Sequence, residues 1–286
     1  MALLGSPDDL GVKRNHGRPG ANLGPDTVRK HLFKMTPPLD LEWENKIQLY
    51  DGGNIECTTD ILKTHKNAKQ LVSSYSQAAD CLIAIGGGHD FASPHFTGFI
   101  EGITKRGGKP PRAGLINIDP HLDVRELTDD LPHSGSPFRE ILESQCIRPQ
   151  NLIQFGFRRN RNSRRHLKYC QDLKVTLLPF EIIQTNTIIH FRRALTQLAN
   201  RCTIIGLTID MDCCTDAEGT SAAPVIGLSA RELCEISSIA AGNKKVAYLE
   251  LGEIAPGLDH NERSARIGAE IVYSFLYGKA NRASGK

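Results

Sequence analysis

The feature that most restricts the fold of this 286-residue chain is a short apolar run that ends abruptly in a polar or glycine-rich turn and then recurs. Such runs lie at residues 81–85, 114–118, 152–155, 203–209 and 246–251. Segments with the apolar spacing of helices lie between them or flank them, at 60–79, 136–143, 191–200, 229–241 and 262–277. Short buried strands that alternate with helices are typical of a parallel sheet with helices on both faces. The sequence therefore predicts an α/β fold with a mostly parallel central sheet.

Composition and charge limit the partners and the location that we expect. No apolar run approaches the roughly 20 residues that span a bilayer, and the start of the chain lacks the pattern of an export signal. The eight cysteines are scattered without CxxC spacing, and several lie in apolar segments, where a thiol behaves as a small hydrophobe. The arginine-rich run 157–165 lacks the interleaved aromatics of a nucleic-acid-binding module. We expect a cytoplasmic protein that binds a small molecule, with no nucleic-acid or membrane partner.

Histidine and aspartate side chains follow three of the predicted strands directly. Alternate positions of an extended segment share one face. The carboxyl ends of parallel strands meet at one edge of the sheet, where ligands bind in such folds. Taken alone, each motif also fits a polar loop or a helix cap; taken together, they predict one convergent set of ligands. The set consists of His89, Asp119, His121, Asp123, Asp210 and Asp212.

This set predicts a pair of divalent metal ions. Carboxylates with two imidazoles form a hard, oxygen-rich ligand set that suits Mn²⁺, and Ni²⁺, Fe²⁺ or Zn²⁺ stays open as an alternative. Four negative charges exceed what one ion needs, whereas two ions about 3.5–4 Å apart use them well by sharing carboxylates. Such a pair lowers the pKa of a water molecule between the ions, so that it ionises near neutral pH.

The same segments resemble those of the ureohydrolase superfamily, which contains arginase, agmatinase and formimidoylglutamase. The resemblance covers nearly the whole chain, through residues 11–32, 86–90, 117–125, 134–138, 208–212 and 250–256. It implies a three-layer, arginase-like fold in a single domain over residues 1–286. It also implies two Mn²⁺ ions per subunit and a homo-oligomer, either a trimer or a hexamer.

The resemblance further implies a role for each ligand. Asp123 matches the residue that also orients the attacking hydroxide, and Glu253 matches the carboxylate that holds the cationic amidine or guanidinium of the substrate. The implied metal roles are terminal ligands of one ion for His89 and Asp123, terminal ligands of the other for His121 and Asp212, and bridging carboxylates for Asp119 and Asp210.

Within the superfamily the sequence resembles the formimidoylglutamase branch. Ser134 stands where arginases and agmatinases carry a histidine proposed as a proton shuttle, and His133, one residue earlier, is retained as a candidate for that role. N-formimino-glutamate carries two carboxylates, so its site needs cations, and arginine holds a carboxylate through two parallel hydrogen bonds. The candidate substrate-binding residues are therefore Ser134, Glu253, Arg125, Arg158, Arg159 and Arg161.

The predicted reaction is the hydrolysis of N-formimino-L-glutamate to L-glutamate and formamide, a step of histidine degradation. Two alternatives stay open: an agmatinase or another guanidino-acid ureohydrolase with the same cluster, and a non-catalytic metal-binding paralogue. A lysine deacetylase of related fold is disfavoured, because its single zinc ion does not require this many carboxylates.

Overall fold

The structure is a computed structural model that describes residues 1–39, 43 and 46–283, and its centre is one eight-stranded sheet. The strands lie side by side in the order β2-β1-β3-β8-β7-β4-β5-β6, and each neighbouring pair is parallel. Their bounds are β1 (Ala2–Gly5), β2 (Tyr50–Asn54), β3 (Leu82–Ile85), β4 (Ala113–Ile118), β5 (Leu152–Phe157), β6 (Thr176–Pro179), β7 (Ile204–Asp210) and β8 (Val246–Gly252). The predicted α/β class with a parallel central sheet is confirmed.

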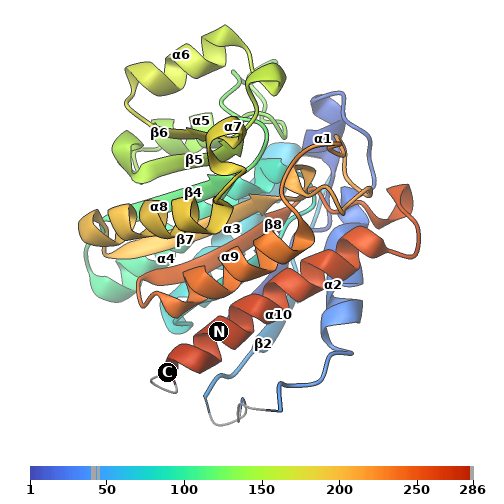
Figure 1. Cartoon of the computed structure of the whole chain (residues 1–286), viewed down its shortest axis with the longest axis vertical. Helices are drawn as coiled ribbons and strands as arrows, with labels where there is room; N and C mark the ends of the chain where they lie inside the picture. The colour runs from blue at the N-terminus through green and yellow to red at the C-terminus, as the bar shows by residue number, and fades with distance from the viewer. Residues whose placement is uncertain (40–42, 44–45, 284–286) are drawn as a thin grey trace.

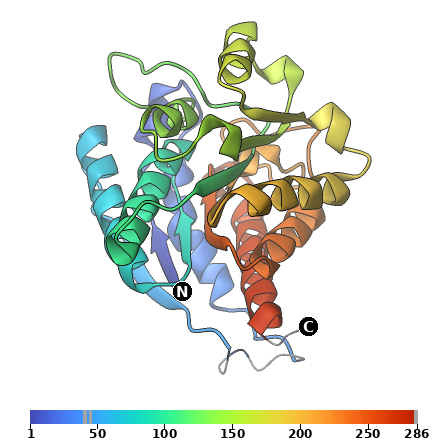
Figure 2. The same cartoon turned by 90° about the vertical axis from the view of Figure 1, so that its left-hand side faces the viewer.

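Helices cover both faces of this sheet and give the molecule three layers (Figure 1). Figure 2 shows α3 and α4 on one side of the strands, and α9 and α10 on the other. Helix α2 packs beside α10, and α8 beside α9. The bounds are α1 (Leu10–Arg14), α2 (Gly24–Leu32), α3 (Ile61–Ala78), α4 (Ala92–Gly107), α5 (Pro137–Glu143), α6 (Arg164–Asp172), α7 (Phe180–Ile183), α8 (Thr187–Arg201), α9 (Ala230–Gly242) and α10 (Arg263–Ala283).

A separate apolar core fills each space between sheet and helices. On one face, Val72 of α3 and Phe99 of α4 belong to the core that contains Leu115 of β4. On the other face, Ile236 of α9 and Phe275 of α10 belong to the core that contains the opposite side of the strands. Successive residues of a strand point to opposite faces. Strands between two helical layers are therefore apolar at most positions on both faces, which is the pattern seen in the sequence.

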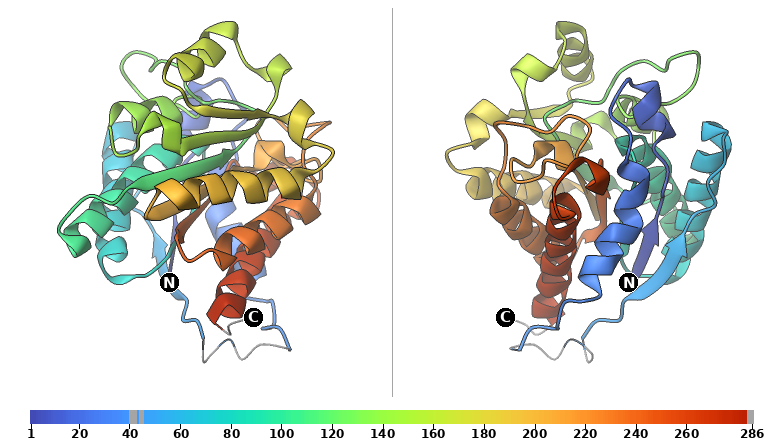
Figure 3. Two further views of the ribbon diagram at one scale, coloured as in Figure 1. Left: turned by 60° about the vertical axis from the view of Figure 1, so that its left-hand side comes forward. Right: turned by 90° about the vertical axis from the view of Figure 1, so that its right-hand side faces the viewer.

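Because all the strands run the same way, their carboxyl ends form one edge of the sheet. The segments that follow β3, β4, β7 and β8 leave this edge side by side, since these four strands are neighbours in the sheet. Figure 3 shows the amino-terminal segment around α1 and the loop before α9 near this end of the molecule. Among the described residues, no helix is long and apolar enough to span a bilayer.

Candidate metal centre and substrate site

The turn that carries His89 depends on a close approach of backbones. A Cβ atom on Gly87 would lie 1.7 Å from the carbonyl oxygen of Asp8, so only glycine fits there. The carbonyl of Gly87 accepts a hydrogen bond from the backbone N–H of Glu253 (2.8 Å), which joins the ends of β3 and β8. Glu253 and Asp123 both have left-handed backbone conformations, with φ of 63° and 46°. Such backbone strain is often concentrated at functional sites.

The six predicted ligands lie together at the carboxyl edge of the sheet. They form two overlapping groups in which the ligand atoms lie within 4.8 Å of one another, and Asp210 belongs to both. Nδ1 of His89 lies 3.1–3.2 Å from carboxylate oxygens of Asp119, Asp123 and Asp210. The first group is His89, Asp119, Asp123 and Asp210; the second is His121, Asp210 and Asp212.

The two oxygens of Asp119 face different members of the set. Oδ2 lies 3.2 Å from Nδ1 of His89, and Oδ1 lies 3.3 Å from Nδ1 of His121. Asp119 and Asp210 thus both lie between the two halves of the set. This arrangement supports the bridging role that the sequence resemblance implied for these two carboxylates.

The buried carboxylates of the predicted ligand set repel one another, so positive charge placed among them would stabilise the set. Burial and the charge of Asp212 raise the pKa of Asp210 well above its usual value. Burial and the charge of Asp119 raise the pKa of Asp123 to about 6. Burial opposes a charge on His121, but its hydrogen bond with Asp119 raises the pKa of this imidazole to about 10. Buried carboxylates that repel each other in this way are stabilised by bound cations, so this donor set fits divalent metal ions.

Groups around the ligands fix their orientation. Nε2 of His89 lies 3.1 Å from Oγ1 of Thr208, which favours the tautomer whose Nδ1 lone pair points into the cluster. The backbone N–H of Ala222 donates to Oδ1 of Asp212 (3.0 Å). The carboxamide of Asn162 accepts from the N–H of Leu122 (2.8 Å) and donates to the carbonyl of Pro120 (2.9 Å), which braces the loop after β4.

Sequence reasoning did not identify these outer residues. The position of Thr208 could have been predicted, because it lies two positions before Asp210 on the same strand and therefore on the same face. Asn162 is 40 positions from Leu122, and Ala222 acts through its backbone. Neither residue has a local pattern that indicates its contact.

Glu253 extends into the buried side of the cluster and has one oxygen free. Oε1 accepts from the backbone N–H of His89 (2.9 Å), whereas Oε2 is buried and has no hydrogen-bond partner among the described residues. Burial and the charges of Asp210 and Asp212 raise the pKa of Glu253 well above its usual value. A buried acceptor without a partner carries an energetic cost that a cationic donor removes. Glu253 therefore suits an amidinium or guanidinium group.

A second group of predicted residues lies around α1. The carboxamide of Asn15, which sequence reasoning missed, accepts from Nη1 of Arg125 (2.8 Å) and donates to Oγ of Ser134 (3.0 Å). Nε2 of His133 lies 3.0 Å from the carbonyl of Glu126, and its Nδ1 accepts from the N–H of Gly135 (3.1 Å). Both ring nitrogens of His133 thus contact backbone of its own loop. A role for His133 as proton shuttle stays a prediction.

The three arginines after β5 differ in their surroundings. Arg158 is partly buried; its backbone N–H donates to the carbonyl of Pro120 (2.8 Å), and its Nη1 donates to the carbonyl of Ile226 (2.6 Å). Its Nε is buried and has no partner in the described part of the chain. Arg159 and Arg161 are exposed on the short helix η5 (Arg159–Arg161). Of the three, Arg158 alone contacts the metal loop through a hydrogen bond of the described structure.

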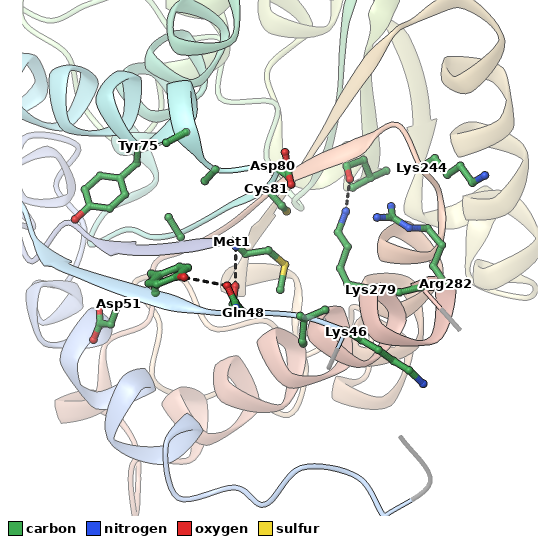
Figure 4. A pocket seen from close by; sticks show the side chains of 17 residues that line it. Met1, Lys46, Gln48, Asp51, Tyr75, Asp80, Cys81, Lys244, Lys279 and Arg282 are labelled. Carbon is green, nitrogen blue, oxygen red and sulfur yellow. Dashed lines mark hydrogen bonds between the residues drawn. The ribbon is translucent and has the colours of Figure 1, made fainter. Parts of the chain in front are cut away.

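Two large hollows lie away from this chemistry. One, of about 920 Å³, opens at the amino ends of β1, β3 and β8, where Lys279 donates to the carbonyl of Val246 and Met1 to that of Gln48 (Figure 4). The other, of about 1070 Å³, lies beside the start of β4. Neither is lined by any of the six predicted ligands. The metal cluster is at the opposite edge, so these hollows are not its substrate pocket.

A parallel sheet between two helical layers, with a carboxylate–imidazole cluster at its carboxyl edge, defines a class of α/β metal-dependent hydrolases. The sequence model of the Arginase family matches residues 1–278. The chain belongs to the Arginase family, which confirms the resemblance seen in the sequence.

Individual proteins of one branch are similar over almost the full length. The formimidoylglutamase of Vibrio parahaemolyticus is 30% identical over 99% of this chain and 84% of that protein. The crystal structure of Trypanosoma cruzi formiminoglutamase with Mn²⁺ superposes with a TM-score of 0.89 at 25% identity, over 98% of this chain and 93% of that one. The formimidoylglutamase of Bacillus subtilis gives a TM-score of 0.86 at 27% identity, over 97% and 86% of the two chains.

Proposed function

We propose that this protein hydrolyses N-formimino-L-glutamate to L-glutamate and formamide with the help of two divalent metal ions, Mn²⁺ in the first instance. The observation that carries the proposal is the unpartnered buried oxygen of Glu253 beside the metal ligands in the described structure. The names of the similar proteins support the same substrate. The cationic Arg125, joined to Ser134 through Asn15, supports a substrate with a negatively charged tail.

The residues that would hold the metals are the two groups described above, and Asp119 and Asp210, which lie near members of both groups, would serve both. Bound divalent ions supply an activated water at neutral pH and positive charge opposite the negative charge that develops during attack. Everything else in the mechanism falls to side chains of the chain itself.

Glu253 binds and orients the substrate head. Its free Oε2 accepts a hydrogen bond from the amidinium N–H, which fixes the formimino carbon over the cluster and balances its charge. Asp123 directs Oδ2 at Nδ1 of His89 (3.1 Å). Its Oδ1 is then available to accept the proton that the attacking water loses and to return it to the glutamate nitrogen as the C–N bond breaks.

The last part of the proposal concerns the arginines that bind the two carboxylates of the substrate. We assign Arg125 and Arg158 this task ahead of Arg159 and Arg161, because the first two contact the loops that surround the metal ligands. Replacing each of the four by alanine tests the assignment. We expect KM to rise at least about tenfold for Arg125 or Arg158, a loss of about 1.4 kcal/mol of binding. Arg164→Ala is the matched control, since this exposed arginine follows the same strand.

Product analysis tests the function itself. Protein loaded with Mn²⁺ is offered formiminoglutamate, arginine, agmatine and guanidinobutyrate, and its metal content is measured alongside. Formamide and glutamate from the first substrate alone support the proposal. Urea from a guanidino substrate moves the protein to the agmatinase-like alternative. Two bound metals without turnover on any of the four support a non-catalytic paralogue.

We also propose that the chain forms one domain over residues 1–286 and assembles as a trimer or hexamer. We further propose that it acts in the cytoplasm, in histidine degradation. The match of the family model to residues 1–278 supports the single domain. Light scattering of the purified protein measures the oligomer, and a mass of one subunit contradicts that part of the proposal.

A further inference from the structure

One metal ligand depends on a loop that contributes no ligand of its own. Oδ1 of Asp212 accepts from the backbone N–H of Ala222 (3.0 Å), ten positions further along the chain. Oδ2 of Asp212 faces Nδ1 of His121 at 3.9 Å, within the second ligand group. The amide of Ala222 therefore holds the carboxylate in the rotamer that turns its other oxygen to the cluster. The position of this amide is set by the two residues before it, Thr220 and Ser221.

Those two residues are held by a single arginine from the amino-terminal segment. Nη2 of Arg18 donates to the carbonyl of Thr220 (2.7 Å), and Nε donates to the carbonyl of Ser221 (3.1 Å). The backbone N–H of Arg18 donates to Oγ of Ser221 (3.1 Å). A planar guanidinium reaches two successive carbonyls at once, which an ammonium group cannot do with the same fixed geometry. Arg18 thus fixes the two peptide units that lead into the Ala222 amide.

The amino-terminal segment is shaped to bring Arg18 there. A Cβ atom on Gly17 would lie 2.4 Å from Oγ of Ser221, so the glycine leaves room for the Ser221 side chain beside Arg18. The buried carboxylate of Asp9 accepts from the N–H of Gly20 (2.7 Å) and forms an ion pair with Lys13. These contacts hold the turn on both sides of Arg18.

We propose that Arg18 is a positioning residue for the metal ligand Asp212, acting through the loop at 220–222. The proposal rests on the proposed metal cluster and extends it to a side chain that touches neither metal nor substrate. Residues outside the ligand set that orient a ligand typically change metal affinity by 10- to 100-fold. Because Arg18 acts through a loop, we expect about a tenfold effect, at the lower end of that range.

The loop has a second anchor that is independent of Arg18. The N–H of Gly219 donates to Oγ of Ser264 (2.8 Å), and its carbonyl accepts from the N–H of Ala255 (2.8 Å). Removal of the exposed Arg18 side chain therefore leaves the loop attached and the core unchanged. The expected defect is a misplaced Ala222 amide in a folded protein.

The test is Mn²⁺ titration of the metal-free protein, followed by the electron paramagnetic resonance signal of free Mn²⁺. The wild type is expected to bind two equivalents. In Arg18→Met, we expect one equivalent to keep its affinity and the other to bind about tenfold more weakly. Arg18→Lys, which keeps the charge, is expected to lie between the two. The spin-coupled signal of paired Mn²⁺ ions appears only when both equivalents are bound, and in the methionine variant it appears at higher Mn²⁺ concentration.

The matched control is Arg14→Met. Arg14 lies in the same segment and also holds two backbone carbonyls, those of Pro132 and Thr128, on a loop that does not contact Asp212 in the described structure. Its Mn²⁺ affinities are expected to equal those of the wild type. Equal affinities in Arg18→Met and the wild type overturn the proposal, and so does an equal loss at both equivalents. A wild type that binds no Mn²⁺ refutes the metal cluster itself, which is a different failure.

Discussion

The backbone N–H of His89 donates a 2.9 Å hydrogen bond to Oε1 of Glu253, a residue 164 positions away. The contact joins the turn after β3 to the end of β8, and it leaves Oε2 of Glu253 as the oxygen without a partner among the described residues. One residue thus contributes an imidazole to the metal cluster and, through its amide, aims the carboxylate proposed to bind the substrate.

Replacing Glu253 by glutamine tests the substrate-binding role of its carboxylate separately from its hydrogen bond with His89. The side-chain amide oxygen of the Glu253→Gln variant can still accept from His89, so we expect the fold and the Mn²⁺ stoichiometry to stay the same. The negative charge opposite the amidinium is lost, and kcat/KM for formiminoglutamate should fall by about 10²–10³-fold. Steady-state kinetics measure this, with Glu218→Gln, an exposed acid in the nearby loop, as control. Full activity in Glu253→Gln would show that the substrate head binds elsewhere.

Asn15→Ala removes the bridge between Arg125 and Ser134. Without the carboxamide, the Arg125 side chain regains rotamer freedom that binding must then restrict. We expect KM to rise about tenfold, equivalent to about 1.4 kcal/mol, with kcat within about twofold of the wild type. Asn160→Ala, an exposed asparagine near Arg158, is the control. A fall in kcat at constant KM would place Asn15 in the chemical step instead.

Metal removal should destabilise the protein, since the buried carboxylates of the cluster then repel one another. A ligand present at 100 times its Kd stabilises the folded state by about 2.7 kcal/mol. For a chain of this size that corresponds to a rise in Tm of about 4–5 °C on adding Mn²⁺ to metal-free protein. Thermal unfolding measures the shift. Asp210→Asn, which alters the ligand common to both groups, should abolish it, and an equal shift in this variant would contradict the site.

The half-buried Glu140 predicts a pH-dependent term in stability that does not involve a metal ligand. Burial raises the pKa of its carboxyl from 4.5 to about 7, against the hydrogen bond that Ser136 donates. The folded state therefore binds this proton more tightly than the unfolded state. Its contribution is present below about pH 4.5 and is lost as the pH rises through about 7.

Glu140→Gln keeps the oxygen that accepts from Ser136 and removes the titration. We expect the free energy of unfolding of this variant to exceed that of the wild type by about 1–2 kcal/mol at pH 8, and to match it at about pH 4. Urea unfolding at the two pH values measures the difference. The same difference at both pH values would mean that the ionisation of Glu140 is not its source.

The sequence predicted the middle of the sheet and missed β2 and β6 at its edges, as well as the short buried strand β1 next to β2. The five apolar runs correspond to β3, β8, β7, β4 and β5, which are five consecutive strands of the sheet. A strand covered on both faces is apolar at most of its positions, so it stands out in the sequence. The edge strand β2 has the sequence YDGGN and is mostly exposed, and β6 at the other edge is only half-buried along most of its length. Neither has a continuous apolar run to recognise.

In the site, residues that lie in short local motifs were predicted, and residues whose contacts join distant parts of the chain were not. The six ligands lie in short motifs next to predicted strands, and the structure brings all six together. Asn15 lies 119 positions from Ser134, and Arg18 lies 203 positions from Ser221. Such contacts exist only after the loops of distant βα units meet at one edge, so no spacing in the sequence indicates them. Their roles, like those of the ligands, stay predictions until the variants are measured.

The strand order has a consequence for how the protein is made. Strand β8, the last strand of the described chain, lies between β3 and β7, in the interior of the sheet. A chain emerging from the ribosome therefore holds every predicted metal ligand before the strand that joins the two halves of the sheet exists. His89 and its turn belong to one half, and the aspartates after β4 and β7 to the other. We therefore expect the metal cluster to assemble only after β8 has entered the sheet, because an ion bound earlier would tether two halves that still have to admit a strand between them.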